Sequence, residues 1–205
     1  MSINVCNDRS MASITSLPSG VSGSSLVLIS EQTASSSSTI DFTSGIDSTY
    51  KEYVFKFTDI HPATNRAIFQ FQSDTGTNTS YNITVTSTYF QSYHKENDGG
   101  AALGYNDSHD DAQSTSFSNL TVHNSNDNDS CASGTLHIFD PSNSTFVKHF
   151  ISNFNHMYTE TGGDKYSWES FKAGYFNTTT ALTRFRFKYD TGNIDSGTIK
   201  LYGVV

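Results

Sequence analysis

Cationic side chains, cysteine and long apolar runs are all scarce in this 205-residue chain. It contains 12 Lys and Arg against 20 Asp and Glu, which gives a formal net charge of −8, and it has no basic cluster. We therefore expect no nucleic-acid partner, because a phosphate backbone requires a basic surface. No segment approaches the ~18 to 20 consecutive apolar residues that span a bilayer, so we expect no membrane insertion.

The two cysteines, Cys6 and Cys131, lie far apart in segments of different character. This spacing gives no support for a disulfide framework, and we expect two free thiols. The first residues also lack the basic start and the apolar stretch of a signal peptide. We therefore expect the protein to be made, and to fold, in a cytoplasm.

Aromatic residues make up 13% of the chain and charged residues only 16%, while Ser, Thr, Asn and Gly are abundant. This mixture favours strands and turns over helices. Residues 1–24 show no sustained period and predict an extended N-terminal arm. Residues 25–205 predict a single β domain whose strands recur in runs with a period of two, about ten in all: Leu26–Ser30, Thr39–Thr43, Tyr53–Ile60, Ala67–Gln72, Tyr81–Thr88, Thr135–Phe139, Thr145–Ile151, Phe171–Phe176, Arg184–Tyr189 and Thr198–Tyr202.

Several of these runs alternate strictly between apolar and polar residues. Phe185, Phe187 and Tyr189 share one face of a run whose other face is cationic. This pattern is typical of an antiparallel strand with one solvated face. Ten-residue helical patterns do not separate the runs, which argues against a parallel α/β sheet. We therefore expect an all-β, antiparallel β-sandwich with a jelly-roll arrangement.

Two polar stretches interrupt the strand pattern. The first, at about 91–130, predicts a long loop with one helical turn at Ala101–Tyr105 and a short strand at Phe117–Val122. The second, His156–Ser170, predicts another loop and contains the only Trp. Its residues Tyr158, Tyr166 and Trp168 are candidates for contact with a partner or receptor, because flat aromatic faces stack on sugars and anchor interfaces. The alternative is that this loop closes over one end of the core.

No metal, cofactor or catalytic site is predicted. The acidic and histidine residues of the first polar stretch suit divalent ions but lack a recognised ligand spacing, so we interpret them as solvated loop residues: His94, Asp98, Asp107, His109, Asp110, Asp111 and His123. The remaining histidines lie in or beside strands, and no G-x-S-x-G elbow accompanies them, so a structural role is favoured. Glycoside hydrolysis needs a pair of flanking carboxyl groups, and none of the five glutamates has a telling context.

Six stretches together resemble a family of uncharacterised, virion-associated β-sandwich proteins of marine tailed bacteriophages. They are Leu28–Ser35, Phe42–Tyr50, Ile60–Thr64, Phe146–Phe150, Ala173–Thr179 and Gly192–Gly203. The last of these is the most specific, and the similarity spans roughly Leu26 to Val204. The resemblance implies a tail-fibre-like or capsid-surface module and supplies no catalytic residues.

From the resemblance we expect a non-enzymatic structural protein on the exterior of a virion that is assembled in the host cytoplasm. The favoured role is a tail-fibre or tail-tip component in host attachment. The alternatives are a capsid decoration protein, acting as cement or head fibre, and a tail-associated glycan hydrolase. The N-terminal arm would bind other virion proteins, and symmetry favours a homo-oligomer, with a trimer preferred. The outer loops would contact a host surface glycan or protein.

Overall fold

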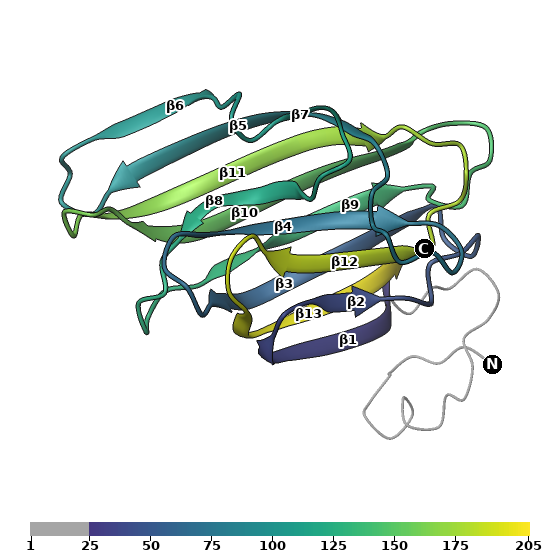
Figure 1. Ribbon diagram of the computed structural model, residues 1–205, viewed down its shortest axis with the longest axis horizontal. Helices are drawn as coiled ribbons and strands as arrows, with labels where there is room; N and C mark the ends of the chain where they lie inside the picture. The colour runs from purple at the N-terminus through teal and green to yellow at the C-terminus, as the bar shows by residue number, and fades with distance from the viewer. Residues whose placement is uncertain (1–24) are drawn as a thin grey trace, which may run out of the picture.

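The computed structural model describes residues 25–205 and contains two antiparallel sheets that face one another as a sandwich (Figure 1). The predicted N-terminal arm, with Cys6, lies outside the described residues. Thirteen strands form over the described range: β1 (Leu26–Ser37), β2 (Ile40–Phe42), β3 (Glu52–Pro62), β4 (Ala67–Asp74), β5 (Val85–Lys95), β6 (Ala101–Tyr105), β7 (Asp111–Ser114), β8 (Ser118–Asn124), β9 (Ala132–Phe139), β10 (Lys148–Thr159), β11 (Lys165–Phe176), β12 (Arg184–Tyr189) and β13 (Ile194–Val204).

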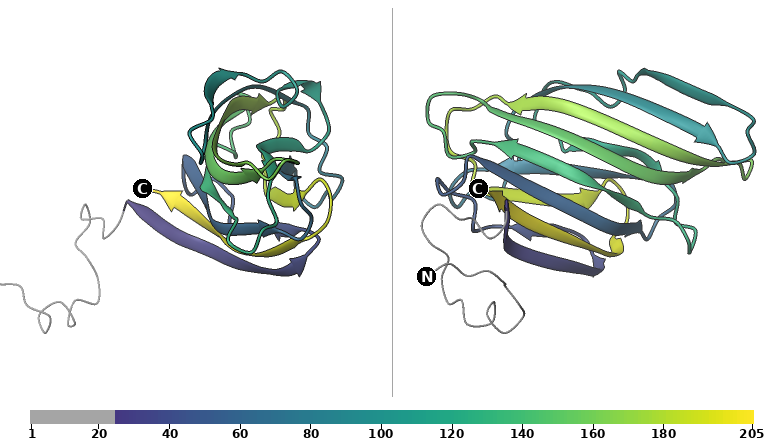
Figure 2. Two further views of the ribbon diagram at one scale, coloured as in Figure 1. Left: turned by 90° about the vertical axis from the view of Figure 1, so that its left-hand side faces the viewer. Right: turned by 180° about the vertical axis from the view of Figure 1, so that it is seen from behind.

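Eight of the strands form a jelly roll, which confirms the predicted fold class. Strands β1, β13, β3 and β9 lie side by side in the larger sheet, and β2, β12, β4 and β8 form the smaller one. The chain passes from one sheet to the other at nearly every step between these strands, which gives the interleaved order of a jelly roll. Viewed from the end, the two sheets curve around a common interior (Figure 2, left).

The other five strands extend the larger sheet beyond β9, and we call them the sheet extension. The β10–β11 hairpin pairs with β9, and β5 pairs with β11. Strands β6 and β7 both pair with β5, so that the nine-stranded sheet runs from β1 to β6. In Figure 1 the extension lies at the top, and β1 at the bottom marks the opposite edge.

The interior of the jelly roll is a cluster of aromatic rings contributed by both sheets. Phe57 lies at its centre, with ring centroids 4.9 Å from Phe154, 5.0 Å from Phe187 and 5.7 Å from Phe69. All four side chains are at most 3% exposed. The strict alternation read from the sequence thus places its aromatic face inside, because successive side chains of a strand point to opposite faces.

The structure corrects both predicted loops. The stretch at about 91–130 contains the end of β5 and all of β6 and β7, and Ala101–Tyr105 is a strand rather than a helical turn, whereas the short strand predicted at Phe117–Val122 is confirmed by β8. The stretch His156–Ser170 belongs mostly to the β10–β11 hairpin. Both errors have one cause: these strands carry polar side chains on faces that other parts of the protein cover or that face water, so hydrophobic alternation is weak.

Candidate functional site

The three predicted contact residues come together, although not on a loop. Tyr158 on β10 lies opposite Tyr166 on β11, and Trp168 follows Tyr166 on the same face. Tyr93 on β5 completes this inner aromatic cluster, with its ring stacked on Trp168 at 4.7 Å. The Tyr158 and Tyr166 rings are 5.3 Å apart. The cluster connects β10, β11 and β5 near the turn of the β10–β11 hairpin, which we call the hairpin end.

The inner aromatic cluster is largely covered, which limits what it could bind. Tyr158 is 9% exposed and Tyr166 is 6% exposed, while Trp168 and Tyr93 are partly exposed. Arg66 lies over the Tyr158 ring at 5.4 Å and Lys95 over the Tyr166 ring at 5.0 Å. Partner contact at these three residues stays a prediction, and in this geometry their first role is to stabilise the hairpin end.

The opposite, outer face of the sheet extension carries a different surface. The strand register places Asn155, Glu169, Ser92 and Leu103 in one row that crosses β10, β11, β5 and β6. The next row toward the hairpin end contains Ser167 and His94. Rows on one face of a sheet are about 7 Å apart along the strands, and neighbours within a row are about 5 Å apart. Apart from Leu103 at the edge, the named residues of these rows form a closely spaced array of polar side chains on the sheet.

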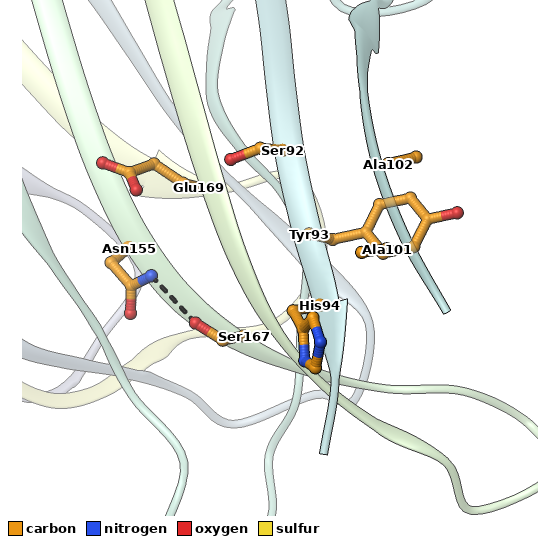
Figure 3. A pocket seen from close by; sticks show the side chains of 8 residues that line it. All are labelled: Ser92, Tyr93, His94, Ala101, Ala102, Asn155, Ser167 and Glu169. Atoms are coloured by element: carbon orange, nitrogen blue, oxygen red, sulfur yellow. Dashed lines mark hydrogen bonds between the residues drawn. The ribbon is translucent and has the colours of Figure 1, made fainter. Parts of the chain in front are cut away.

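This polar array lines a cleft of about 420 Å³, which we call the outer cleft (Figure 3). Its lining comprises Ser92, Tyr93, His94, Ala101, Ala102, Asn155, Ser167 and Glu169. Asn155 Nδ2 donates hydrogen bonds to Ser167 Oγ and to the carbonyl of Trp168, both at 3.2 Å. Glu169 Oε1 accepts from Asn153 Nδ2 at 3.0 Å. These three hydrogen bonds orient the two side chains and do not involve Glu169 Oε2 or Asn155 Oδ1, which are acceptors.

An aromatic row borders the outer cleft on the side away from the hairpin end. Phe171, Phe90 and Tyr105 lie next to one another across β11, β5 and β6. The rings of Phe90 and Phe171 stack at 4.8 Å with an interplanar angle of 10°. Phe90 is 44% exposed, Tyr105 is 59% exposed and Leu103, in the adjoining row, is 74% exposed. Together these side chains form an exposed apolar patch of the kind that is common at interaction sites.

A second, more apolar groove lies on the same outer face near the other end of the strands. It has a volume of about 500 Å³ and is lined chiefly by Phe139, His149, Ile151, Ala173 and Tyr175. An adjoining cavity of about 540 Å³ shares Phe139 and His149 and reaches the exposed Phe146. The outer face of the larger sheet thus presents polar and apolar recesses over the same strands.

The inner face of the sheet extension holds a buried ion pair. Lys172 Nζ lies 2.7 Å from Asp111 Oδ2, and both side chains are under 10% exposed. Ser87 and Ser118 donate to Asp111 Oδ2 at 2.8 and 2.6 Å, and Lys172 donates to the His109 carbonyl at 2.9 Å. Burial lowers the pKa of Lys172, and the facing carboxylate opposes that shift. The pair and its serine partners connect β11 to β5, β7 and β8.

A buried histidine, His156, and a half-buried one, His109, also lie on the inner side of the extension. Burial lowers the pKa of His156 to about 3, with His123 and His109 adding to the effect. Burial also lowers the pKa of His109 to about 4, and its ring contacts Tyr89 at 5.3 Å. Neither ring nitrogen of His156 has a hydrogen-bond partner among the described residues. Both histidines are therefore neutral over the usual pH range.

The residues weighed as metal ligands are dispersed. His94 Nε2 lies 3.2 Å from Asp98, Asp111 is paired with Lys172, and the Asp110 carboxylate accepts from the Tyr105 hydroxyl. Within residues 25–205, no three His, Cys, Asp or Glu side chains gather as a metal site would require. The same range contains no helix with the length and hydropathy for a bilayer crossing. Cys131 is a free, partly buried thiol whose pKa is raised by burial.

These observations define the chain as a jelly-roll β-sandwich whose larger sheet is extended over a buried polar layer. No family model matches it, and no curated protein or solved structure is similar to it at a significant level. The function is therefore inferred from the fold and surface of this chain. Sequence reasoning missed the outer cleft because Ser92, Asn155 and Glu169 are brought into one row only by strand pairing.

Proposed function

We propose that this chain is a non-enzymatic structural module on the exterior of a tailed-phage particle, where it serves as a tail-fibre or tail-tip component in host attachment. The observation that carries the proposal is the outer face of the sheet extension, which combines a polar cleft with an exposed aromatic row. A rigid, solvent-facing sheet of this kind is suited to recognising another surface.

Two further features support the proposal. The stretches that resemble phage virion proteins include Phe146–Phe150 and Ala173–Thr179, which fall in or beside β10 and β11 of the sheet extension. The aromatic core and the long ladders of β1, β13 and β3 form a stable base that carries the extension at one edge. The separation of a base from a recognition surface fits a module at the end of a longer assembly.

The proposal is tested by locating the protein on purified particles. Antibody raised against the full chain and detected with gold should label tails in negative-stain micrographs. Quantitative mass spectrometry of the same particles should give a few to a few tens of copies of the protein. Label confined to heads, with dozens to hundreds of copies, would replace the tail role with capsid decoration. Absence of the protein from washed particles would refute both roles.

A further inference from the structure

We propose that the outer cleft and its bordering aromatic row bind a neutral oligosaccharide. The site is made of Asn155, Glu169 and Ser92 in one row and of Phe171, Phe90 and Tyr105 in the next. In its biological setting this inference rests on the proposed role in host attachment. The proposed binding site lies on the face of these strands opposite the inner aromatic cluster, which is largely covered.

The spacing of the two rows fits a saccharide. Adjacent rows are about 7 Å apart along the strands, which is the scale of one sugar ring. A ring lying over the boundary would meet apolar aromatic surface on one side and polar side chains on the other. Sugars present both kinds of surface, since their C–H groups are apolar and their hydroxyls both donate and accept hydrogen bonds. Aromatic side chains with a few placed polar groups are what such sites require.

Hydrogen bonds within the protein orient the side chains of the polar row so that they can contact the hydroxyl groups of a sugar. Glu169 is oriented by Asn153, and Asn155 is oriented by Ser167 and the Trp168 carbonyl, so each is fixed by one part of its side chain. The remaining carboxylate and amide oxygens are acceptors, and Ser92 Oγ, directly opposite Glu169, can donate or accept. Figure 3 shows Ser92, Glu169 and Asn155 on three neighbouring strands at the cleft. Because the strands are rigid, little conformational entropy is lost when a ligand binds.

Charge selects a neutral sugar over an acidic one. The three outer rows that carry the cleft and the aromatic side chains contain no Lys or Arg between β10 and β6, and they contain the Glu169 carboxylate. Of the basic side chains nearby, His94 lies 3.2 Å from Asp98, and Lys165 lies 3.6 and 3.8 Å from Asp127 and Asp129. The chain as a whole carries a formal net charge of −8. A sulfate or uronate group would therefore meet repulsion without a compensating cation.

The test is an array of neutral, uronate-containing and sulfated oligosaccharides probed with the full-length protein coupled to fluorescent beads, so that weak binding is detected. We expect signal on neutral oligosaccharides. Phe171→Ala should weaken the signal by about tenfold, and Glu169→Gln, which keeps the side-chain shape, should weaken it by about threefold or more. Tyr175→Ala, on the same strand and face but outside the cleft, should leave the signal within about twofold of the unmodified protein.

A blank array, signal confined to acidic sugars, or binding that neither Phe171→Ala nor Glu169→Gln weakens would overturn the inference. Circular dichroism of each variant shows whether it folds. If Phe171→Ala does not fold, Glu169→Gln alone decides the test. Failure of this inference is distinguishable from failure of the proposed function. A blank array for a protein that is present on particles removes only the saccharide site. Saccharide binding by a protein absent from particles removes only the virion role.

Discussion

The jelly roll and the sheet extension share the nine-stranded sheet, but the inner face of the extension is the more polar of the two. Phe57 in the jelly roll is surrounded by other phenylalanine rings, whereas the equivalent layer beneath β11 contains Lys172, Asp111 and His156. Burial of apolar rings stabilises a fold, while burial of charge and unpaired imidazole does so weakly or not at all. The extension therefore combines apolar burial, through Phe150, Phe154 and Phe176, with specific polar contacts such as the Lys172–Asp111 pair.

The largest expected effect tests the jelly-roll side of this comparison. Phe57→Ala removes the ring at the centre of the core and leaves a cavity among Phe69, Phe154 and Phe187. We expect a loss of about 4 kcal/mol in the free energy of unfolding, measured by urea denaturation. Phe90→Ala, at a ring that is 44% exposed, is the matched control. A similar loss in the two variants would contradict a core centred on Phe57.

The next effect concerns the buried ion pair of the extension. Lys172→Met leaves the Asp111 carboxylate buried without its cation, and we expect a loss of about 3 kcal/mol in the free energy of unfolding. The double variant Lys172→Met, Asp111→Leu removes both charges and should recover much of that loss. A double-mutant cycle in urea measures the coupling between the two residues. If the double variant is less stable than Lys172→Met alone, Asp111 stabilises the fold through its serine hydrogen bonds even without Lys172.

Acid should destabilise the extension through its histidines. The folded pKa of His156, about 3, lies below the unfolded value of about 6.5, so only the unfolded chain gains a proton between these values. Stability contributed by the neutral ring is therefore present above pH 6.5 and is lost as the pH falls, by about 1.4 kcal/mol per pH unit for one such group. His109, with a pKa of about 4, acts in the same direction.

The measurement is the urea midpoint at several values between pH 7 and pH 5, a window above the carboxylate range. His156→Leu should flatten the profile and leave stability at pH 7 unchanged or higher, because it also removes two unpartnered ring nitrogens. His149→Leu, at an exposed histidine on the same strand, should keep the original slope. Equal slopes for the unmodified protein and His156→Leu would show that His156 is not the group that titrates.

The smallest expected effect concerns Leu103, on the outermost strand of the extension. Leu103 on β6 is 74% exposed, so Leu103→Ser should change the free energy of unfolding by less than about 0.5 kcal/mol. Calorimetric unfolding of the two proteins measures the difference. A larger loss would mean that another part of the protein covers β6 in solution.

Strand-by-strand prediction succeeded where one face is apolar and failed where both faces are polar. The run Arg184–Tyr189 was predicted with the bounds that β12 has, because Phe185, Phe187 and Tyr189 alternate with cations. Strand β6 was missed because its five residues are all exposed and carry no alternation. The first half of β11 was missed because its inner residues, Tyr166, Trp168 and Ser170, do not form an uninterrupted apolar series. Tyr158, Tyr166 and Trp168 lie together on paired strands rather than on the predicted loop, and their role in partner contact stays a prediction.

The sequence by itself determined that this protein is an antiparallel β-sandwich, because alternating aromatic residues can be buried only if two sheets face one another. Only the tertiary structure decided which polar residues became neighbours. Asn155, Glu169 and Ser92 are far apart along the chain, and they share a row because β10, β11 and β5 pair in one particular register. A shift of one residue would turn each of them to the opposite face, and no local pattern in the sequence records that choice.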